Sequence, residues 1–160
     1  MSVLLGGFAG SLLTAALTFW LEHRRQRRAL RVAARLVAGE LRTIESRLHI
    51  TVASGTWREL HTHALTHAEW DEHCGAFAAH VPLERWSDLQ TAYRLAGSIS
   101  VAAGARREDE RLTQVEREEI ETAAQAAGAA AADLELDSAA DKDGHGHPLA
   151  RAHRIRLRHP

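Results

Sequence analysis

Apolar residues are unevenly distributed along the chain, and the first pattern is an uninterrupted run near its start. Residues 3–21 read VLLGGFAGSLLTAALTFWL, nineteen residues without a charge. At about 1.5 Å per residue, a helix of this length matches a hydrocarbon core of roughly 30 Å. Backbone polar groups in lipid must be paired within the segment, so the run predicts a helix. We therefore expect residues 1–22 to form a transmembrane anchor.

After this run, apolar residues recur at alternating steps of four and three, which is typical of an amphipathic helix. The positions are Leu30, Ala34, Val37, Leu41, Ile44 and Leu48. Nothing breaks the pattern before Ser54-Gly55, so the anchor helix is expected to continue to that point. The seam suits either a parallel coiled coil that extends a membrane dimer or packing on later helices of the same chain. Val32 and Leu36 broaden the apolar face and favour packing within the chain.

Four shorter helices are predicted in the rest of the chain. Residues 56–59 (TWRE) and 66–69 (THAE) have the form of capping boxes and predict helices near 57–65 and 67–80. Pro82 suits the first turn of a helix that runs to about Ala103. Its apolar face is formed by Trp86, Leu89, Tyr93, Ala96 and Ile99. A last helix is predicted over 108–135, with Leu112, Val115 and Ile120 inside.

No segment shows the two-residue alternation of a strand, so the predicted fold class is all-α. We expect one transmembrane helix that continues into a small cytoplasmic antiparallel helical bundle over residues 23–136. From residue 137 the chain contains glycine, proline and mixed charge with few apolar anchors. Residues 137–160 are therefore expected to form a disordered, flexible tail.

Charge is strongly asymmetric, although the formal total is only −1. Residues 24–35 contain six arginines and no acid, whereas residues 108–121 contain seven acids and two arginines. Arginine excess marks the cytoplasmic flank of a span, so the N-terminus is expected outside and the domain inside the inner (plasma) membrane. The acidic stretch is expected to lie against the arginine-rich helix. A cleaved signal peptide is disfavoured. A signal peptide carries its positive charge before the apolar run, whereas the arginines of this chain follow it.

The residues around the end of the run are candidates for the membrane interface. Trp20 is placed at the headgroup level, and Arg24, Arg25, Arg27 and Arg28 are placed to bind anionic headgroups. Their position beside the span already explains this basic block, so no nucleic acid is expected as a partner.

Small residues within the run predict helix pairing. Gly6 and Gly10 form a small-xxx-small motif that Thr14 and Thr18 continue, and such motifs let two membrane helices approach closely. A second small ridge lies beside it: Gly7, Ser11 and Ala15. The motif favours a homodimer through the transmembrane helix, although glycine is also common in membrane helices without pairing.

Histidine is frequent, with five of the eleven histidines between residues 61 and 80. Six side chains in this segment are possible zinc or nickel ligands: His61, His63, His67, Asp71, His73 and Cys74. There is no HExxH motif and no CxxC pair, so no metal or other cofactor is expected. Cys74 lacks an identifiable orienting group, and no enzymatic activity is expected.

The layout resembles that of small uncharacterised bacterial single-pass membrane proteins from high-GC genomes. The resemblance rests on the glycine-rich run, on RRQRRALRVAARLVAGELRTIESRL and on WDEHCGAFAAHVPLERWSDLQTAY. It implies an N-terminal anchor with a cytoplasmic helical domain and assigns no activity.

Three functional hypotheses follow from the sequence. The first is a membrane-tethered helical interaction or scaffold module that self-associates or binds an unidentified membrane or cytoplasmic protein. The second is a metal or pH sensor that uses the His61–His80 segment, and the third is an oligomerising holin- or toxin-like membrane effector.

Overall fold

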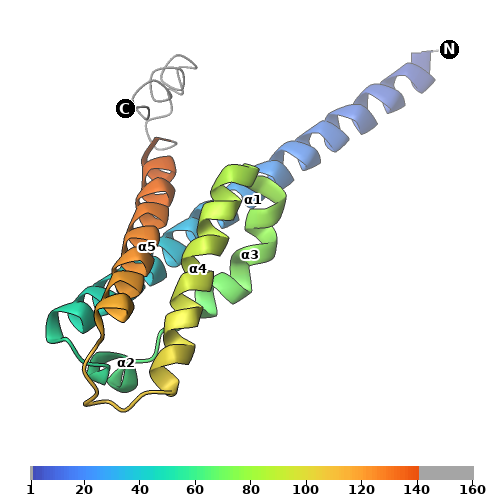
Figure 1. Ribbon diagram of the computed structural model, residues 1–160. Coiled ribbons are helices and arrows are strands. Elements are labelled where there is room, and N and C mark those ends of the chain that lie inside the picture. The colour runs from blue at the N-terminus through green and yellow to red at the C-terminus, as the bar shows by residue number, and fades with distance from the viewer. Residues whose placement is uncertain (1, 141–160) are drawn as a thin grey trace, which may run out of the picture.

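The computed structural model describes residues 2–140, with the side chains of residues 16–136. This part of the chain forms five helices and no named strand, so the all-α prediction is confirmed (Figure 1). The helices are α1 (Ser2–Ser54), α2 (Arg58–Thr62), α3 (Ala68–His80), α4 (Leu83–Gly104) and α5 (Gln114–Ala140).

Helix α1 is the longest element, and α5 packs along it in the opposite direction (Figure 1). At one end the Leu112 N–H donates to the Gly55 carbonyl at 2.9 Å, and at the other end Arg42 donates to Glu135. Helix α1 ends where the sequence predicts, because Gly55 has a φ of +67°, which glycine adopts without a side-chain clash. The antiparallel arrangement of the bundle is thus fixed at both ends of the α1–α5 contact.

The seam predicted on α1 faces the core of the bundle. Val37, Leu41, Ile44 and Leu48 are buried, mainly against the alanine-rich face of α5. The alternative of packing within the chain is therefore confirmed for this seam. The reason given for it was wrong, because Val32 and Leu36 are 56% and 43% exposed and lie on the opposite face of the helix.

The close approach of α5 depends on its small residues. Ala123, Ala124, Ala127 and Ala131 are all buried, and Gly128 lies so near α1 that an added Cβ would overlap the Glu45 carboxylate. Small side chains bury little area each, but they bring two helix backbones close enough for continuous van der Waals contact. The alanine-rich half of α5 is thus a packing surface for α1.

Helices α3 and α4 form an aromatic layer beside the α1–α5 pair, in which α3 packs on α1 and α4 packs on α5. The Trp70 ring stacks on Tyr93 and Trp86, with centroids 4.7 and 5.0 Å apart, and Phe77 is fully buried. Trp86 and Tyr93 were predicted on the apolar face of α4. Tyr93 and Phe77 are buried, whereas Trp70 and Trp86 are half-buried.

Glu40 joins this layer to α1 through a buried carboxylate. The Tyr93 hydroxyl donates to Glu40 Oε2 at 2.7 Å, and the backbone N–H groups of Glu69 and Trp70 donate to its two oxygens at 3.2 Å. The first N–H groups of a helix have no partner within it. Glu40 therefore caps α3 from a different helix and ties α1, α3 and α4 together.

Neither predicted capping box forms. Helix α2 begins after Trp57 and α3 after His67, and neither residue makes a side-chain cap hydrogen bond. A capping box does form at Thr113 and Glu116: the Thr113 N–H donates to Glu116 at 2.8 Å, and the Glu116 N–H donates to Thr113 Oγ1 at 3.3 Å. This box starts α5 at Gln114 rather than near residue 108.

Two further predictions about the last helix are wrong. Val115 is 64% exposed, whereas Ile120 is buried as expected. The acidic start of α5 lies beside residues 52–56, which is roughly 25 Å along α1 from Arg35 at 1.5 Å per residue. Its acids pair locally, as Glu116 does with Arg106 at 2.8 Å. The acidic and arginine-rich segments therefore do not face each other.

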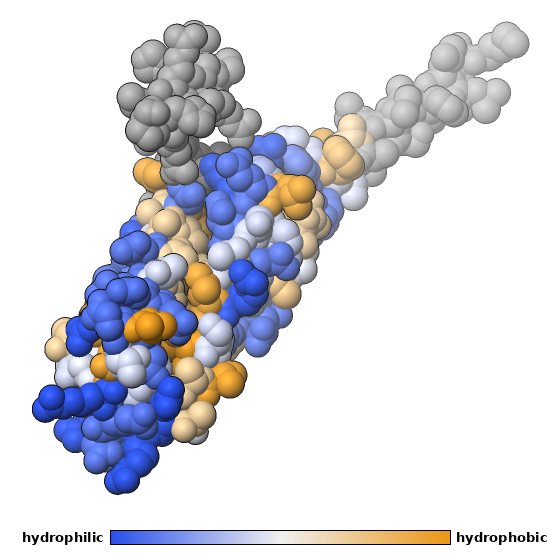
Figure 2. Space-filling view, in the orientation of Figure 1, coloured by the Kyte–Doolittle hydropathy of each residue, from blue (hydrophilic) through white to orange (hydrophobic). Residues whose placement is uncertain are grey.

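The N-terminal part of α1 projects from the bundle as a single helix (Figure 1). Every residue from 16 to 29 is exposed, and Figure 2 shows hydrophobic colour on this arm next to the grey atoms. Within the described residues, no helix offers a stretch both long and apolar enough to cross a bilayer. Residues 2–15 make up most of the predicted span, and their side chains lie outside those described.

At the other end, α5 extends to Ala140, four residues beyond the predicted domain boundary at 136. Residues 141–160, which contain most of the predicted tail, lie outside the described residues.

Candidate interaction surface

The main candidate surface is a stripe on the outer face of α1, here called the outer seam. It consists of Val32, Leu36, Gly39, Thr43, Ser46 and Ile50. All six residues are exposed, and they follow one another at steps of four and three. Each lies two residues after a member of the buried seam, which places it about 200° around the helix. Helix α1 therefore has two seams of heptad spacing on opposite faces, of which α5 covers one.

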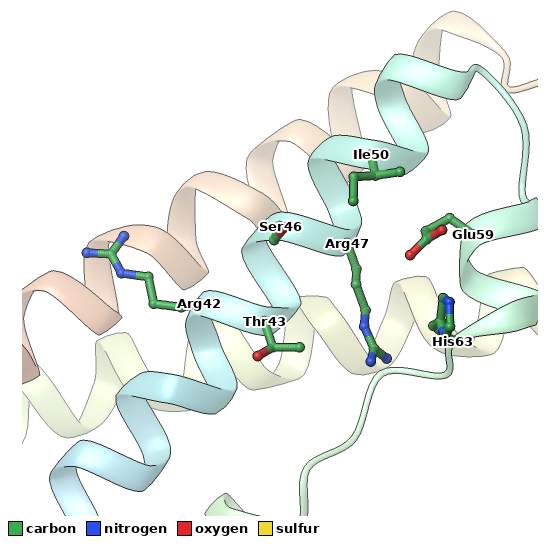
Figure 3. A pocket seen from close by; sticks show the side chains of 7 residues that line it. All are labelled: Arg42, Thr43, Ser46, Arg47, Ile50, Glu59 and His63. Carbon is green, nitrogen blue, oxygen red and sulfur yellow. The ribbon is translucent and has the colours of Figure 1, made fainter.

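The C-terminal half of the outer seam forms the floor of a groove of about 440 Å³ between α1 and α2 (Figure 3). Thr43, Ser46 and Ile50 line the groove on the α1 side, and Glu59 and His63 face them from α2 and its C-terminal end. The groove is open and has a hydroxyl-rich floor with charged edges. Its shape suits a helix or extended segment better than a small enclosed ligand.

Two arginines flank the outer seam in different ways. Arg42 points away from the groove in Figure 3 and pairs with Glu45 and Glu135, both at 2.9 Å. These carboxylates raise the pKa of Arg42, and the pKa of Glu135 is lowered by Arg42. On the other flank, Arg47 donates to the Ala64 carbonyl at 2.6 Å and holds the chain after α2 against α1. One flank therefore carries a cluster of one arginine and two glutamates, and the other carries Arg47 with Glu59 of α2 beside it.

The predicted membrane-interface residues all lie on the projecting arm. Trp20, Arg24, Arg25, Arg27 and Arg28 are exposed, and the Arg24 guanidinium lies over the Trp20 ring, 5.2 Å from its centroid. This is a cation–π contact. The structure thus groups these side chains on one helical segment at the base of the predicted span.

The predicted helix-pairing residues Gly6, Gly10 and Thr14 lie within α1. Their side chains lie outside those that the structure describes, so the pairing motif stays a prediction.

The histidine-rich segment does not converge on a metal. His61 contacts the Arg106 carbonyl at 3.0 Å, His63 lines the groove beside α1, and His67 packs edge-on against Tyr93. Within the described residues, one group of three possible ligands is found, formed by Glu69, Glu72 and His73. Of the six ligands considered from the sequence, only His73 belongs to it. The group is on a single helix, where solvated acidic residues are common without a metal, and the sensor hypothesis gains no support from it.

A second groove, of about 650 Å³, lies between the start of α3 and the middle of α4. Trp70 and Tyr93 form its apolar wall, and Asp71 and Arg94 stand at its edges. Cys74 lies outside this groove, with its thiol directed to the Asp71 carbonyl at 3.8 Å. The two rings of this wall also pack α3 against α4. The groove is therefore the outer surface of the aromatic layer.

Comparisons with protein-family models, with curated proteins and with solved structures give no match. The layout-level resemblance proposed from the sequence therefore stays a prediction.

Sequence reasoning missed two of the features described above. Glu40 was not singled out, although a glutamate among the apolar residues of a seam is a recognisable signal for a buried polar contact. Val32 and Leu36 were assigned to the buried face, and the outer seam was overlooked because Gly39, Thr43 and Ser46 are small or polar.

Proposed function

We propose that this chain is a membrane-tethered helical interaction module, anchored by residues 3–21 with its bundle on the cytoplasmic side. The observation that carries the proposal is the projecting arm of α1, which is exposed on all sides from residue 16 to residue 29. Leu17 and Phe19 are 56% and 75% exposed there. Large apolar side chains on a single uncovered helix are unfavourable in water and favourable in lipid.

The order of side chains along the arm supports entry into a bilayer. Apolar residues end at Leu21, and a basic segment begins at Arg24 after only Glu22 and His23. Trp20 and Arg24, in contact with each other, suit the headgroup region, where one side of a side chain meets lipid and the other meets water. Each arginine near an anionic surface contributes on the order of 1 kcal/mol to attraction.

The interaction part of the proposal is supported by the outer seam. A helix that packs on one face normally carries charged residues on the opposite face. Helix α1 instead presents six consecutive heptad positions without a charged side chain, and they are exposed from Val32 to Ile50. Such a surface suits a second helix.

Membrane fractionation of the full chain tests the tether. We expect the protein to stay with the membrane through an alkaline carbonate wash, because a spanning segment survives this treatment whereas peripheral proteins are released. Protease added to inverted vesicles should digest the bundle, and protease added to intact spheroplasts should not. Release by carbonate would refute the anchor, and digestion in spheroplasts would refute the orientation.

A variant with Arg24, Arg25, Arg27 and Arg28 replaced by glutamine separates orientation from insertion. It should still resist carbonate, because the apolar run is unchanged. It should show mixed protease accessibility, because only two of the six arginines in residues 24–35 remain. A matched variant with Arg94 and Arg107 replaced by glutamine, both exposed on the bundle, should behave like the wild type.

A further inference from the structure

The arginines between residues 24 and 35 are unevenly distributed around α1, which is an unbroken helix over these residues. Four of the six follow one another at steps of four and three and therefore lie within about 60° of one another around the helix. These four, here called the arginine face, are Arg24, Arg28, Arg31 and Arg35. Arg25 and Arg27 lie on its two flanks, and the single acid between residues 3 and 39, Glu22, lies about 150° from its centre. The charge of the arm is thus directed to one side of the helix.

The side of α1 that holds the aromatic layer is turned away from the arginine face. Glu40 accepts hydrogen bonds from Tyr93 and from the first turn of α3. It lies about 140° around the helix from Arg35 and about 180° from Arg31. The groove of about 650 Å³ between α3 and α4 is on the outer surface of that layer. A membrane on the arginine side would therefore leave this groove uncovered.

Apolar side chains continue the arginine face toward the predicted span. Leu17 lies seven residues before Arg24 and Trp20 lies four residues before it, and both are 56% exposed. The Arg24 guanidinium lies over the Trp20 ring. One face of the arm therefore changes from apolar to basic in the order in which a membrane changes from hydrocarbon to phosphate.

We propose that the arginine face binds anionic phosphate groups of the membrane surface, so that α1 tilts toward this face and the groove between α3 and α4 points away from the lipid. This rests on the proposed function, because the anchor brings the arm to the surface. It adds Arg31 and Arg35 to the lipid-binding residues, and it fixes the side of the bundle that a soluble partner can reach.

The direction of tilt matters because most of the arginines stand above the headgroup layer. Arg28, Arg31 and Arg35 lie about 10, 15 and 21 Å past Leu21, whereas this layer is about 5–8 Å deep. A guanidinium about 6 Å from the helix axis lies about 7 Å nearer to the lipid when the helix tilts by about 35° toward it than when the helix tilts away. This difference is close to one Debye length, about 8 Å at physiological ionic strength. Because attraction to anionic lipid falls off over that length, each of these arginines favours a tilt toward its own face.

A tilt in the opposite direction would bring acids to the lipid. The start of α4 belongs to the aromatic layer and lies at the arm end of the bundle (Figure 1). Glu84 and Asp88 are exposed there, and Arg85 between them is half-buried. An anionic surface repels two acids more than it attracts one arginine, so this side of the bundle is disfavoured as the side that faces the lipid.

The acids beside the arginine face are too far from the lipid to oppose the proposed tilt. Glu45 and Glu135 both pair with Arg42 at 2.9 Å. Arg42 is on the same side of α1, about 31 Å past Leu21. After a tilt of about 35° it still lies about two Debye lengths beyond the headgroup layer.

Energy transfer from a labelled cysteine to an acceptor lipid tests the direction of tilt. The full chain, with Cys74 replaced by serine, is reconstituted in phosphatidylcholine vesicles with or without one third phosphatidylglycerol. Single cysteines are introduced as His49→Cys and Gln90→Cys, both at exposed positions. His49 lies about five helical turns after Arg31 on the same face, and Gln90 lines the groove.

The two labels should respond to anionic lipid in opposite directions. The label at residue 49 should approach the bilayer, by about 10 Å for a change from an upright helix to a tilt of about 35°. The label at residue 90 should move away from it, because the aromatic layer is raised by the same tilt.

Removing the two arginines furthest from the span completes the test. Arg31→Gln combined with Arg35→Gln should reduce the response of both labels to anionic lipid by at least half. Arg94→Gln combined with Arg107→Gln removes the same charge from exposed positions on the bundle and should leave the response unchanged. Equal helicity of the two variants by circular dichroism excludes unfolding as the cause.

The outcomes separate this proposal from the tether. Protein that resists carbonate but shows no response to anionic lipid at either label overturns the arginine face and leaves the tether intact. A label at residue 90 that approaches the lipid overturns the direction of tilt. An unchanged response after the loss of Arg31 and Arg35 overturns their part in binding. Protein released from the vesicles by carbonate overturns the proposed function itself.

Discussion

Replacing Glu40 with alanine should destabilise the bundle more than any replacement of an exposed acid. The change removes a charge-assisted hydrogen bond from Tyr93, worth about 1.5–3 kcal/mol. It also leaves the N–H groups of Glu69 and Trp70 without their acceptor, which is equivalent to losing a helix cap, worth about 1 kcal/mol. Removing a buried charge offsets part of this loss. We expect the free energy of unfolding to fall by about 2–4 kcal/mol.

Urea unfolding of the full-length protein in mild detergent, followed by tryptophan fluorescence, measures this change because Trp70 stacks directly on Tyr93. Glu119→Ala, at an exposed position on α5, is the matched control and should change stability by less than about 0.5 kcal/mol. Tyr93→Phe alone should cost about 1.5–3 kcal/mol, because it removes the same charge-assisted hydrogen bond. The double variant should show a coupling energy of about 1–2 kcal/mol. A loss from Glu40→Ala as small as that of the control, or zero coupling, would refute the role given to this carboxylate.

Three further predictions address capping, ionisation and close packing. Thr113→Ala should lower the free energy of unfolding by about 1 kcal/mol, and Thr66→Ala should leave it unchanged. If urea unfolding gave the same decrease for both variants, the cap assignment would be contradicted. Burial is the main cause that raises the pKa of Tyr93, and the hydrogen bond to the Glu40 carboxylate is the next. Since the raised pKa favours the neutral phenol, stability is full below the unfolded value of about 10 and falls as pH rises above it. Tyr93 is the single tyrosine, so absorbance at 295 nm should show a step near pH 10 in urea but not in the folded protein, where such a step would count against burial. Gly128→Leu should lower the free energy of unfolding by about 1–3 kcal/mol through overpacking. Gly75→Ala should raise it by about 0.5–1 kcal/mol. Thermal melting measures both changes, and a neutral Gly128→Leu would argue against the close approach of α5.

The helices that the sequence predicted well are those whose signals are local and repeated. The seam from Leu30 to Leu48 gives six matching positions, and Gly55 supplies a stop at a defined residue. The end of α1 and the burial of this seam from Val37 to Leu48 were therefore correct, whereas the addition of Val32 and Leu36 to the same face was wrong. The apolar face of α4 was found for the same reason. Periodicity works here because each position adds independent support for one helix face.

Capping shows where local reasoning failed. The pattern threonine-x-x-glutamate occurs at 56–59, 66–69 and 113–116, and only the third forms a box. Before α3, Glu40 accepts the N–H groups of residues 69 and 70, so the cap comes from 29 and 30 residues away. At the first site, Thr56 pairs with Arg111 across the bundle. No feature of a four-residue window distinguishes these cases, because the competing partners are distant in sequence.

The charge prediction failed for a related reason. Opposite charges in two helices predict contact only if the helices align at those residues, and the register of α5 on α1 is set by packing. The buried alanines of α5 pack on the buried seam of α1, and the Leu112 N–H donates to the Gly55 carbonyl. These two contacts place the acidic start of α5 at the far end of α1 from the arginine block. Exposed ion pairs are worth up to about 1 kcal/mol each, too little to shift a packed helix by several turns.

The two seams of α1 differ in which helix supplies the small residues. On the buried seam, the small residues belong to α5, so α1 contributes large side chains and α5 fits around them. On the outer seam, the small residues belong to α1 itself, with Gly39 near the middle and nothing within reach of it. If the outer seam were only a solvated face, Gly39→Ala would stabilise the protein by about 1 kcal/mol without other effect. If it packs against a helix of a partner, the same replacement should weaken that association while the fold of this chain is strengthened. Opposite changes in folding stability and in partner binding from one methyl group would show that Gly39 serves association rather than folding.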